Sequence, residues 1–213
     1  MDLKKHLDRA EDALKRGQAD FAAELCDQVL DFAPGEARAA ELLARALMAL
    51  GEGRKGLFGR LGAGPAGLAA GLSKLARNAE GEARSRRRAF IKDPGDLEKG
   101  FAWADALERA GYAGAALGAF GALAERHGEA AKRAGGLAAA QGEVEAALEF
   151  YRLALEANPR DTEAMRARKN LAAEQALRTK KYEEAESGFD LAVDPDAFLR
   201  AARGEKEPEE RGS

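Results

Sequence analysis

Four segments of the chain, residues 17–34, 111–128, 142–159 and 180–195, share one pattern. Each opens with a turn, then has an alanine, an aromatic residue (cysteine in the first segment) four positions later, and an apolar residue three positions further on. The resulting triplets are Ala22/Cys26/Val29, Ala116/Phe120/Leu123, Ala147/Tyr151/Ala154 and Ala185/Phe189/Ala192. Spacings of four and three place three residues on one face of a helix. The pattern therefore predicts four helices that each bury one face.

The residues that build strands are nearly absent. The chain of 213 residues holds one isoleucine, three valines and two threonines, which is too few β-branched residues for a sheet. Alanine, leucine and the long charged residues, which dominate, favour helices. The 24 glycines are explained by tight turns and by close contacts between helix backbones. The sequence therefore predicts an all-α fold.

Proline marks the end of three of the four segments, at Pro34, Pro159 and Pro195, because it cannot continue a helix. Together with the alanine–aromatic step, this resembles the tetratricopeptide repeat (TPR) family, whose unit is a helix–turn–helix of about 34 residues. The resemblance is strongest over residues 97–195, where 147–161 is close to the family consensus, and weakest over 54–92. It implies antiparallel helical hairpins stacked as a right-handed superhelix, an α-solenoid.

The breaks in the pattern set the expected helices and domains. The first helices of the hairpins are expected at about 3–16, 36–50, 96–110, 129–141 and 161–179. Their partners are expected at about 19–33, 113–126, 144–157 and 182–193, followed by a short capping helix at 195–203. The predicted divisions are an N-terminal repeat with its following helix (1–53), a basic glycine-rich insertion plus helix (54–95), the C-terminal repeats (96–203) and a disordered tail (204–213).

The TPR resemblance implies a non-catalytic scaffold or adaptor that binds a protein or peptide on its concave surface. In that family the first helix of each pair lines the groove. The polar faces of those helices supply the candidate partner-binding residues, which are Arg38, Glu41, Arg45, Glu98, Lys132, Arg133, Arg166, Lys169 and Asn170.

Residues 54–92 form a basic segment within an otherwise acidic chain. They carry ten basic and two acidic residues, whereas the whole chain has a formal net charge of −3. The basic residues are Arg54, Lys55, Arg60, Lys74, Arg77, Arg84, Arg86, Arg87, Arg88 and Lys92. One interpretation is a glycine-broken loop and a helix packed on the array. The alternative is a docking element for an anionic membrane, nucleic acid or an acidic protein surface.

Motifs for catalysis or cofactor binding are weak. The glycines at 62, 64 and 67 match a dinucleotide fingerprint in spacing, but no strand precedes them. His6 and His127 lack ligands at metal spacing, and His127 is expected to cap the carbonyl groups of a helix end. Cys26 and Trp103 occupy packing positions. We therefore expect no enzyme activity, metal or cofactor.

The sequence also limits where the protein acts. The first residues lack the apolar core of a secretory signal, and no stretch reaches the length of a membrane span. A single cysteine fits a reducing compartment. The expected location is the cytoplasm, while the partner's identity and the oligomeric state stay open.

Overall fold

A computed structural model describes residues 2–58 and 79–193, with side chains over 2–52 and 79–177. All secondary structure in these described ranges is helical, which confirms the all-α prediction. The nine helices found there are α1 (Leu3–Lys15), α2 (Ala19–Phe32), α3 (Ala37–Phe58), α4 (Ala79–Lys92), α5 (Leu97–Arg109), α6 (Ala113–Leu123), α7 (Gly128–Ala140), α8 (Val144–Ala157) and α9 (Thr162–Val193). The chain divides into two compact units, residues 1–168 and 169–213. Each is described by itself.

Glycines in the left-handed region make one kind of turn between helices. Gly17 joins α1 to α2, Gly111 joins α5 to α6 and Gly142 joins α7 to α8, with φ angles of 74°, 84° and 79°. Residues with a Cβ atom rarely adopt these angles, so glycine ends the first helix of each of these hairpins at low conformational cost.

Proline marks the second kind of turn. Pro34, Pro94 and Pro159 separate α2 from α3, α4 from α5 and α8 from α9. An acidic residue follows two positions later in each case and caps the next helix. The Asp96 carboxylate accepts a hydrogen bond from the Lys99 N–H, and the Asp161 carboxylate accepts from the Ala164 N–H. Glycine turns and proline turns therefore recur along much of the chain, and the Pro94 turn combines both features because Gly95 has a φ angle of 82°.

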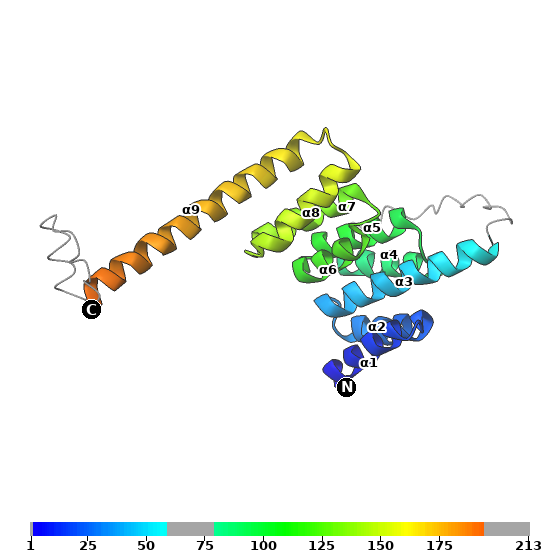
Figure 1. Cartoon of the computed structure of the whole chain (residues 1–213). Coiled ribbons are helices and arrows are strands. Elements are labelled where there is room, and N and C mark those ends of the chain that lie inside the picture. The colour runs from blue at the N-terminus through cyan, green and yellow to red at the C-terminus, as the bar shows by residue number, and fades with distance from the viewer. Residues whose placement is uncertain (1, 59–78, 194–213) are drawn as a thin grey trace, which may run out of the picture. The chain divides into compact units, whose positions relative to one another are not determined.

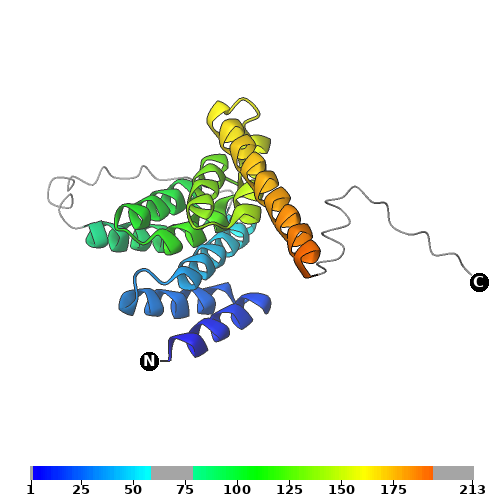
Figure 2. The same ribbon diagram turned by 90° about the vertical axis from the view of Figure 1, so that its left-hand side faces the viewer.

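Most helices in unit 1–168 pack against their neighbours in sequence, from the α1–α2 hairpin at one end to the α7–α8 hairpin at the other (Figures 1 and 2). The exception is α3, which packs on α2 and also on α6. Ala37 meets Gly114, Glu41 meets Gly118, and Glu52 pairs with Arg126, so α3 and α6 run parallel. The predicted boundary between residues 53 and 54 falls inside α3.

The triplets identified in the sequence form much of the core. Ala22/Cys26/Val29, Ala116/Phe120/Leu123 and Ala147/Tyr151/Ala154 are all buried, as predicted. Helix α4 has a fourth buried triplet, Ala83/Arg87/Phe90, at the same spacing. Trp103 is fully buried beside Phe90, which confirms its place in the core. The fourth triplet predicted from the sequence, at 185–192, lies outside the described side chains.

Two expected helix boundaries are wrong. Helix α3 continues to Phe58 rather than ending near residue 50, so Gly51 does not stop it. Helix α9 runs unbroken from Thr162 to Val193, where a turn was expected near residue 180. Every turn between helices in the described ranges contains a glycine or a proline or, before α7, is followed directly by Gly128. No glycine or proline occurs between Pro159 and Gly188, which explains why α9 is unbroken there. The expected capping helix at 195–203 lies outside the described residues.

The expected role of His127 is also corrected. His127 does not cap carbonyl groups at the end of α6, because it is the N-cap residue of α7 and its Nδ1 accepts a hydrogen bond from the Ala130 N–H at 3.1 Å. Its ring stacks on Phe101, with the ring centroids 4.9 Å apart.

Candidate interaction groove

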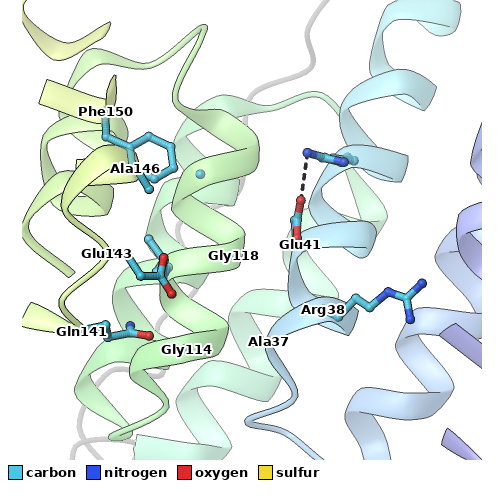
Figure 3. Close-up of a pocket in the computed structure, with 12 residues that line it drawn as sticks. Ala37, Arg38, Glu41, Gly114, Gly118, Gln141, Glu143, Ala146 and Phe150 are labelled. Atoms are coloured by element: carbon cyan, nitrogen blue, oxygen red, sulfur yellow. Dashed lines mark ion pairs between the residues drawn. The ribbon is translucent and has the colours of Figure 1, made fainter. Parts of the chain in front are cut away.

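An open groove of about 470 Å³ lies between α3, α6 and α8 (Figure 3). Helix α6 forms its floor, and α3 and α8 form its two walls. Its lining residues come from all three helices and the turn before α8. They are Ala37, Arg38, Glu41, Arg45, Gly114, Leu117, Gly118, Gly121, Gln141, Glu143, Ala146 and Phe150.

Three glycines of α6 line the floor of the groove, so no side chains project from these positions. Gly114, Gly118 and Gly121 lie on one face of α6, at spacings of four and three. A Cβ atom at Gly118 would lie 2.7 Å from the Ala37 carbonyl oxygen, so only glycine allows α3 to approach α6 this closely. A Cβ atom at Gly121 would lie 3.1 Å from the Phe150 ring. The floor is therefore helix backbone and small apolar surface, with Leu117 as its one large side chain.

The α3 wall carries charged residues that are already paired within the chain. Glu41 and Arg45 form an ion pair of 2.8 Å, and the Arg45 side chain remains 60% exposed. Arg38 points away from the groove (Figure 3) and binds Asp8 and Glu11 of α1. Hydrogen bonds from Lys15 and Arg38 lower the Glu11 pKa to about 2. This contact fixes α1 to the outer side of α3 and leaves Glu41 and Arg45 as the polar groups that the α3 wall presents to the groove.

The α8 wall is apolar in its middle and polar at its start. Ala146 and Phe150 are half-buried side chains beside the glycine floor, whereas Gln141 and Glu143 are exposed where α8 begins (Figure 3). The groove thus combines an apolar base with a carboxylate at one end of the α8 wall and a guanidinium farther along the α3 wall.

The three lining helices run in the same direction. Ala37, Gly114 and Glu143, which lie at the starts of α3, α6 and α8, are found at one end of the groove, and Phe150 lies towards the other (Figure 3). The N-cap residues of α6 and α8 make no side-chain capping hydrogen bond. Aligned peptide dipoles give helix N-termini a partial positive charge, so the uncapped N–H groups of α6 and α8 add positive potential here, whereas the Glu36 carboxylate caps the start of α3.

Only part of the predicted partner-binding set lies here. Arg38, Glu41 and Arg45 line the groove, although Arg38 points outward. Glu98 on α5 and Lys132 and Arg133 on α7 lie elsewhere, because second helices, α6 and α8, supply the rest of the groove instead of α5 and α7. Glu98 is near His127, Lys132 pairs with Glu129, Asp161 and Glu163, and Arg133 pairs with Asp105 and Glu108. Arg166 is exposed in the first unit, and Lys169 and Asn170 are exposed in the second.

The described basic residues of 54–92 have mixed environments. Arg84 and Arg86 form ion pairs with Glu80 and Glu82 along α4, and Arg88 and Lys92 are exposed. Arg87 is buried. The side chains of Arg54, Lys55, Arg60, Lys74 and Arg77 lie outside the described part, so a docking role for the whole segment stays a prediction.

Arg87 links two helices that are distant in sequence. Its side chain is 5% exposed and pairs with Asp27 and Asp31 on α2. The Nε atom lies 2.8 Å from Asp27 Oδ1, as an ion pair without hydrogen-bond alignment. Partial burial raises the Asp27 pKa, and the charge of Arg87 opposes this effect. Arg87 therefore joins α4 to α2 inside the chain.

Chemical sites other than the groove are limited. Burial raises the pKa of the Cys26 thiol to about 12, which leaves it protonated and unreactive. Within the part of the chain that the structure describes, no group of three or more His, Cys, Asp and Glu residues could hold a metal ion. None of the helices searched in that part is long and apolar enough to cross a membrane.

Sequence reasoning missed the floor and the α8 wall. The glycines at 114, 118 and 121 were visible as a helical stripe, which indicates close backbone contact but not the partner. Comparison with known proteins adds no assignment, since the chain matches no family model and no curated protein is significantly similar to it.

Proposed function

We propose that the protein is a TPR-like, non-catalytic scaffold that binds a segment of a protein partner in the groove between α3, α6 and α8. The observation that carries this proposal is the groove itself. It is open to solvent, has an apolar base of small residues, and has polar groups near both ends. Such a surface suits a segment with a few apolar side chains and flanking charges.

The arrangement of hairpins supports the wider part of the proposal. The buried triplets, the glycine turns and the proline turns repeat along the chain in the order expected of TPR units, and we propose that they form part of a right-handed solenoid. Such arrays use the surface of one helical layer to hold partners. The cytoplasmic location and the lack of enzyme activity that the sequence indicates stay predictions.

A groove-blocking variant tests the proposed function. Ala146 is half-buried on the α8 wall, and Ala146→Trp places an indole over the glycine floor. The matched control is Ala140→Trp, at an exposed position in the last turn of α7 that is not among the residues lining the groove. Partners captured from cells by the wild-type chain and by Ala140→Trp, but lost with Ala146→Trp, would support the proposal. Equal capture by all three would contradict it, provided circular dichroism shows equal folding.

A further inference from the structure

The walls of the groove indicate the conformation of what binds there. All three sides are helices, whose backbone N–H and C=O groups are bonded within each helix except at the ends. An extended peptide gains no main-chain hydrogen bonds from such walls, in contrast to binding along a sheet edge. The polar side chains of the α3 wall, Glu41 and Arg45, are paired with each other, so they offer a peptide backbone few hydrogen bonds along the groove. A helical segment avoids this cost because it satisfies its own backbone.

The floor sets how closely that segment approaches. The glycines at 114, 118 and 121 line the base with backbone, although α3 and Phe150 already lie close to Gly118 and Gly121, and Leu117 and Phe150 are the larger apolar contacts. Small and medium apolar residues at helical spacing fit this base. The α3 wall from Ala37 to Arg45 is about 12 Å long at 1.5 Å per residue, which matches roughly two turns of a bound helix.

The charges set the direction of the bound helix. The starts of α6 and α8, whose first N–H groups have no side-chain cap, favour the negative C-terminal end of another helix at this end of the groove. Glu143 lies at that same end and suits a basic residue in the last turn of the ligand. Arg45 lies farther along α3 and, with donors beyond those used by Glu41, suits an acidic residue in the first turn. An acidic first turn and a basic last turn are what a stable helix itself prefers.

We propose that the groove binds one amphipathic α-helix of a partner protein, antiparallel to α3, α6 and α8. Its apolar stripe lies on the glycines of α6, its acidic first turn meets Arg45, and its basic last turn meets Glu143. This inference rests on the proposed function, because it specifies what the same groove binds.

A displayed peptide library tests the conformation and the charges together. It contains 12-residue peptides of two designs, one helix-forming with a stripe of Ala, Leu and Met, and one extended with Pro, Val and Thr. Both designs vary Glu, Lys and Gln elsewhere. Binders are selected on the full chain and then counted against Ala146→Trp and Ala140→Trp. We expect helix-forming binders that lose at least tenfold in affinity with Ala146→Trp, and that carry Glu in the first turn and Lys in the last.

Single charge changes give the second readout. Glu143→Lys is expected to select Glu in the last turn of the peptide, and Arg45→Gln to remove the preference for Glu in the first. A photo-reactive benzoylphenylalanine at the C-terminal end of a binder should cross-link near Ala37 and Gln141, and one at the N-terminal end near Arg45.

The outcomes separate the two proposals. Extended binders that Ala146→Trp blocks, helices without the charge preference, or cross-links in the reverse direction would overturn the helix inference and leave the proposed function standing. Binders that Ala146→Trp never weakens would overturn both. Self-association of the wild-type chain that Ala146→Trp abolishes would assign the groove to a second copy, and would also overturn the inference.

Discussion

Helices α4 and α6 each have a buried triplet of the same spacing, but the central residue is charged in α4 and aromatic in α6. In α6 the central residue is Phe120, fully buried and 5.3 Å from the Phe101 ring, centroid to centroid. In α4 the equivalent residue is Arg87, almost as deeply buried, with its charge directed to Asp27 and Asp31. One helix is held by apolar packing that any neighbouring hairpin could offer. The other combines apolar packing of Phe90 on Trp103 of α5 with an ion pair to carboxylates of α2.

The difference bears on specificity. Apolar packing contributes much stability but selects weakly among similar faces, whereas a buried guanidinium is costly unless its partners are present. The Arg87 pair joins two helices that are not neighbours in sequence, since Asp31 and Arg87 are 56 positions apart. We infer that the ion pair specifies which helix α4 meets more than it adds stability.

The largest expected loss of stability comes from removing the apolar packing of Phe120 in α6. Phe120→Ala should lower the free energy of unfolding by about 3–5 kcal/mol, because it leaves a cavity among fully buried residues. Urea denaturation followed by circular dichroism measures this loss. Phe32→Ala is the control, since its side chain is 76% exposed and the change should cost within about 0.5 kcal/mol. A loss below about 1 kcal/mol at Phe120 would show that the triplet does not hold the hairpins together.

Removing the partners of Arg87 should have the next largest effect. In Asp27→Ala/Asp31→Ala the buried guanidinium loses both carboxylates, at a cost of about 2–3 kcal/mol, somewhat reduced because both aspartates are partly exposed. The same denaturation experiment applies, with Glu24→Ala on α2 as the control. A double variant as stable as Glu24→Ala would show that water replaces the aspartates and that the pair carries no specificity.

Replacing Arg87 itself should cost less than removing its partners. Arg87→Met keeps an unbranched side chain in the buried position and removes the charge, so we expect a change within about 1 kcal/mol. Combined with Asp27→Ala/Asp31→Ala, it should recover most of the stability lost in that double variant. If Arg87→Met is as damaging as Phe120→Ala, the ion pair contributes stability directly, contrary to the comparison above.

The smallest effect concerns an exposed arginine, Arg38, which joins α1 to α3 through Asp8 and Glu11. The folded-state pKa of Glu11 is about 2, below its usual 4.5, so this carboxylate favours the folded state above pH 4.5 and loses that contribution as the pH falls towards 2. Glu11→Gln should therefore flatten the acid limb of a stability–pH curve. Glu24→Gln is the control. Equal stability–pH curves for the two variants would show that Glu11 does not contribute to the loss of stability in acid.

Local features of the fold could be predicted from sequence because they depend on nearby residues. Glycine and proline gave the turns, and the alanine–aromatic triplets gave the buried faces of α2, α6 and α8. The contact between α3 and α6 could not be predicted this way, because it brings together residues as far apart in sequence as Glu52 and Arg126. The burial of Arg87 was not predicted, because it lies in a run of arginines, which is typical of a solvated face. The spacing of Ala83, Arg87 and Phe90, which repeats that of the other triplets, was the available signal.

The sequence prediction covers only part of the groove that the structure shows. Assigning it to first helices gave Arg38, Glu41 and Arg45 on α3. Beyond α3, however, α6 and α8 supply the lining of this groove, so Gly118, Ala146 and Phe150 lie outside the predicted set, and Lys132 and Arg133 lie elsewhere. A partner-binding role for the predicted residues stays a prediction. A repeat pattern identifies equivalent helices, but an interruption in the array can change which of them share a face.

The packing of α3 on α6 also has a kinetic consequence. Glu52 and Arg126, whose side chains meet at 2.7 Å, are 74 positions apart, whereas hairpins that contact only their neighbours can fold locally. Contacts of such long range require a large loop to close and slow the folding of a chain. During synthesis, the groove cannot be complete until Phe150 has been added and α8 has formed. A partner that requires both walls would therefore bind only after α3, α6 and α8 have packed together. Binding would then show that this part of the chain has finished folding.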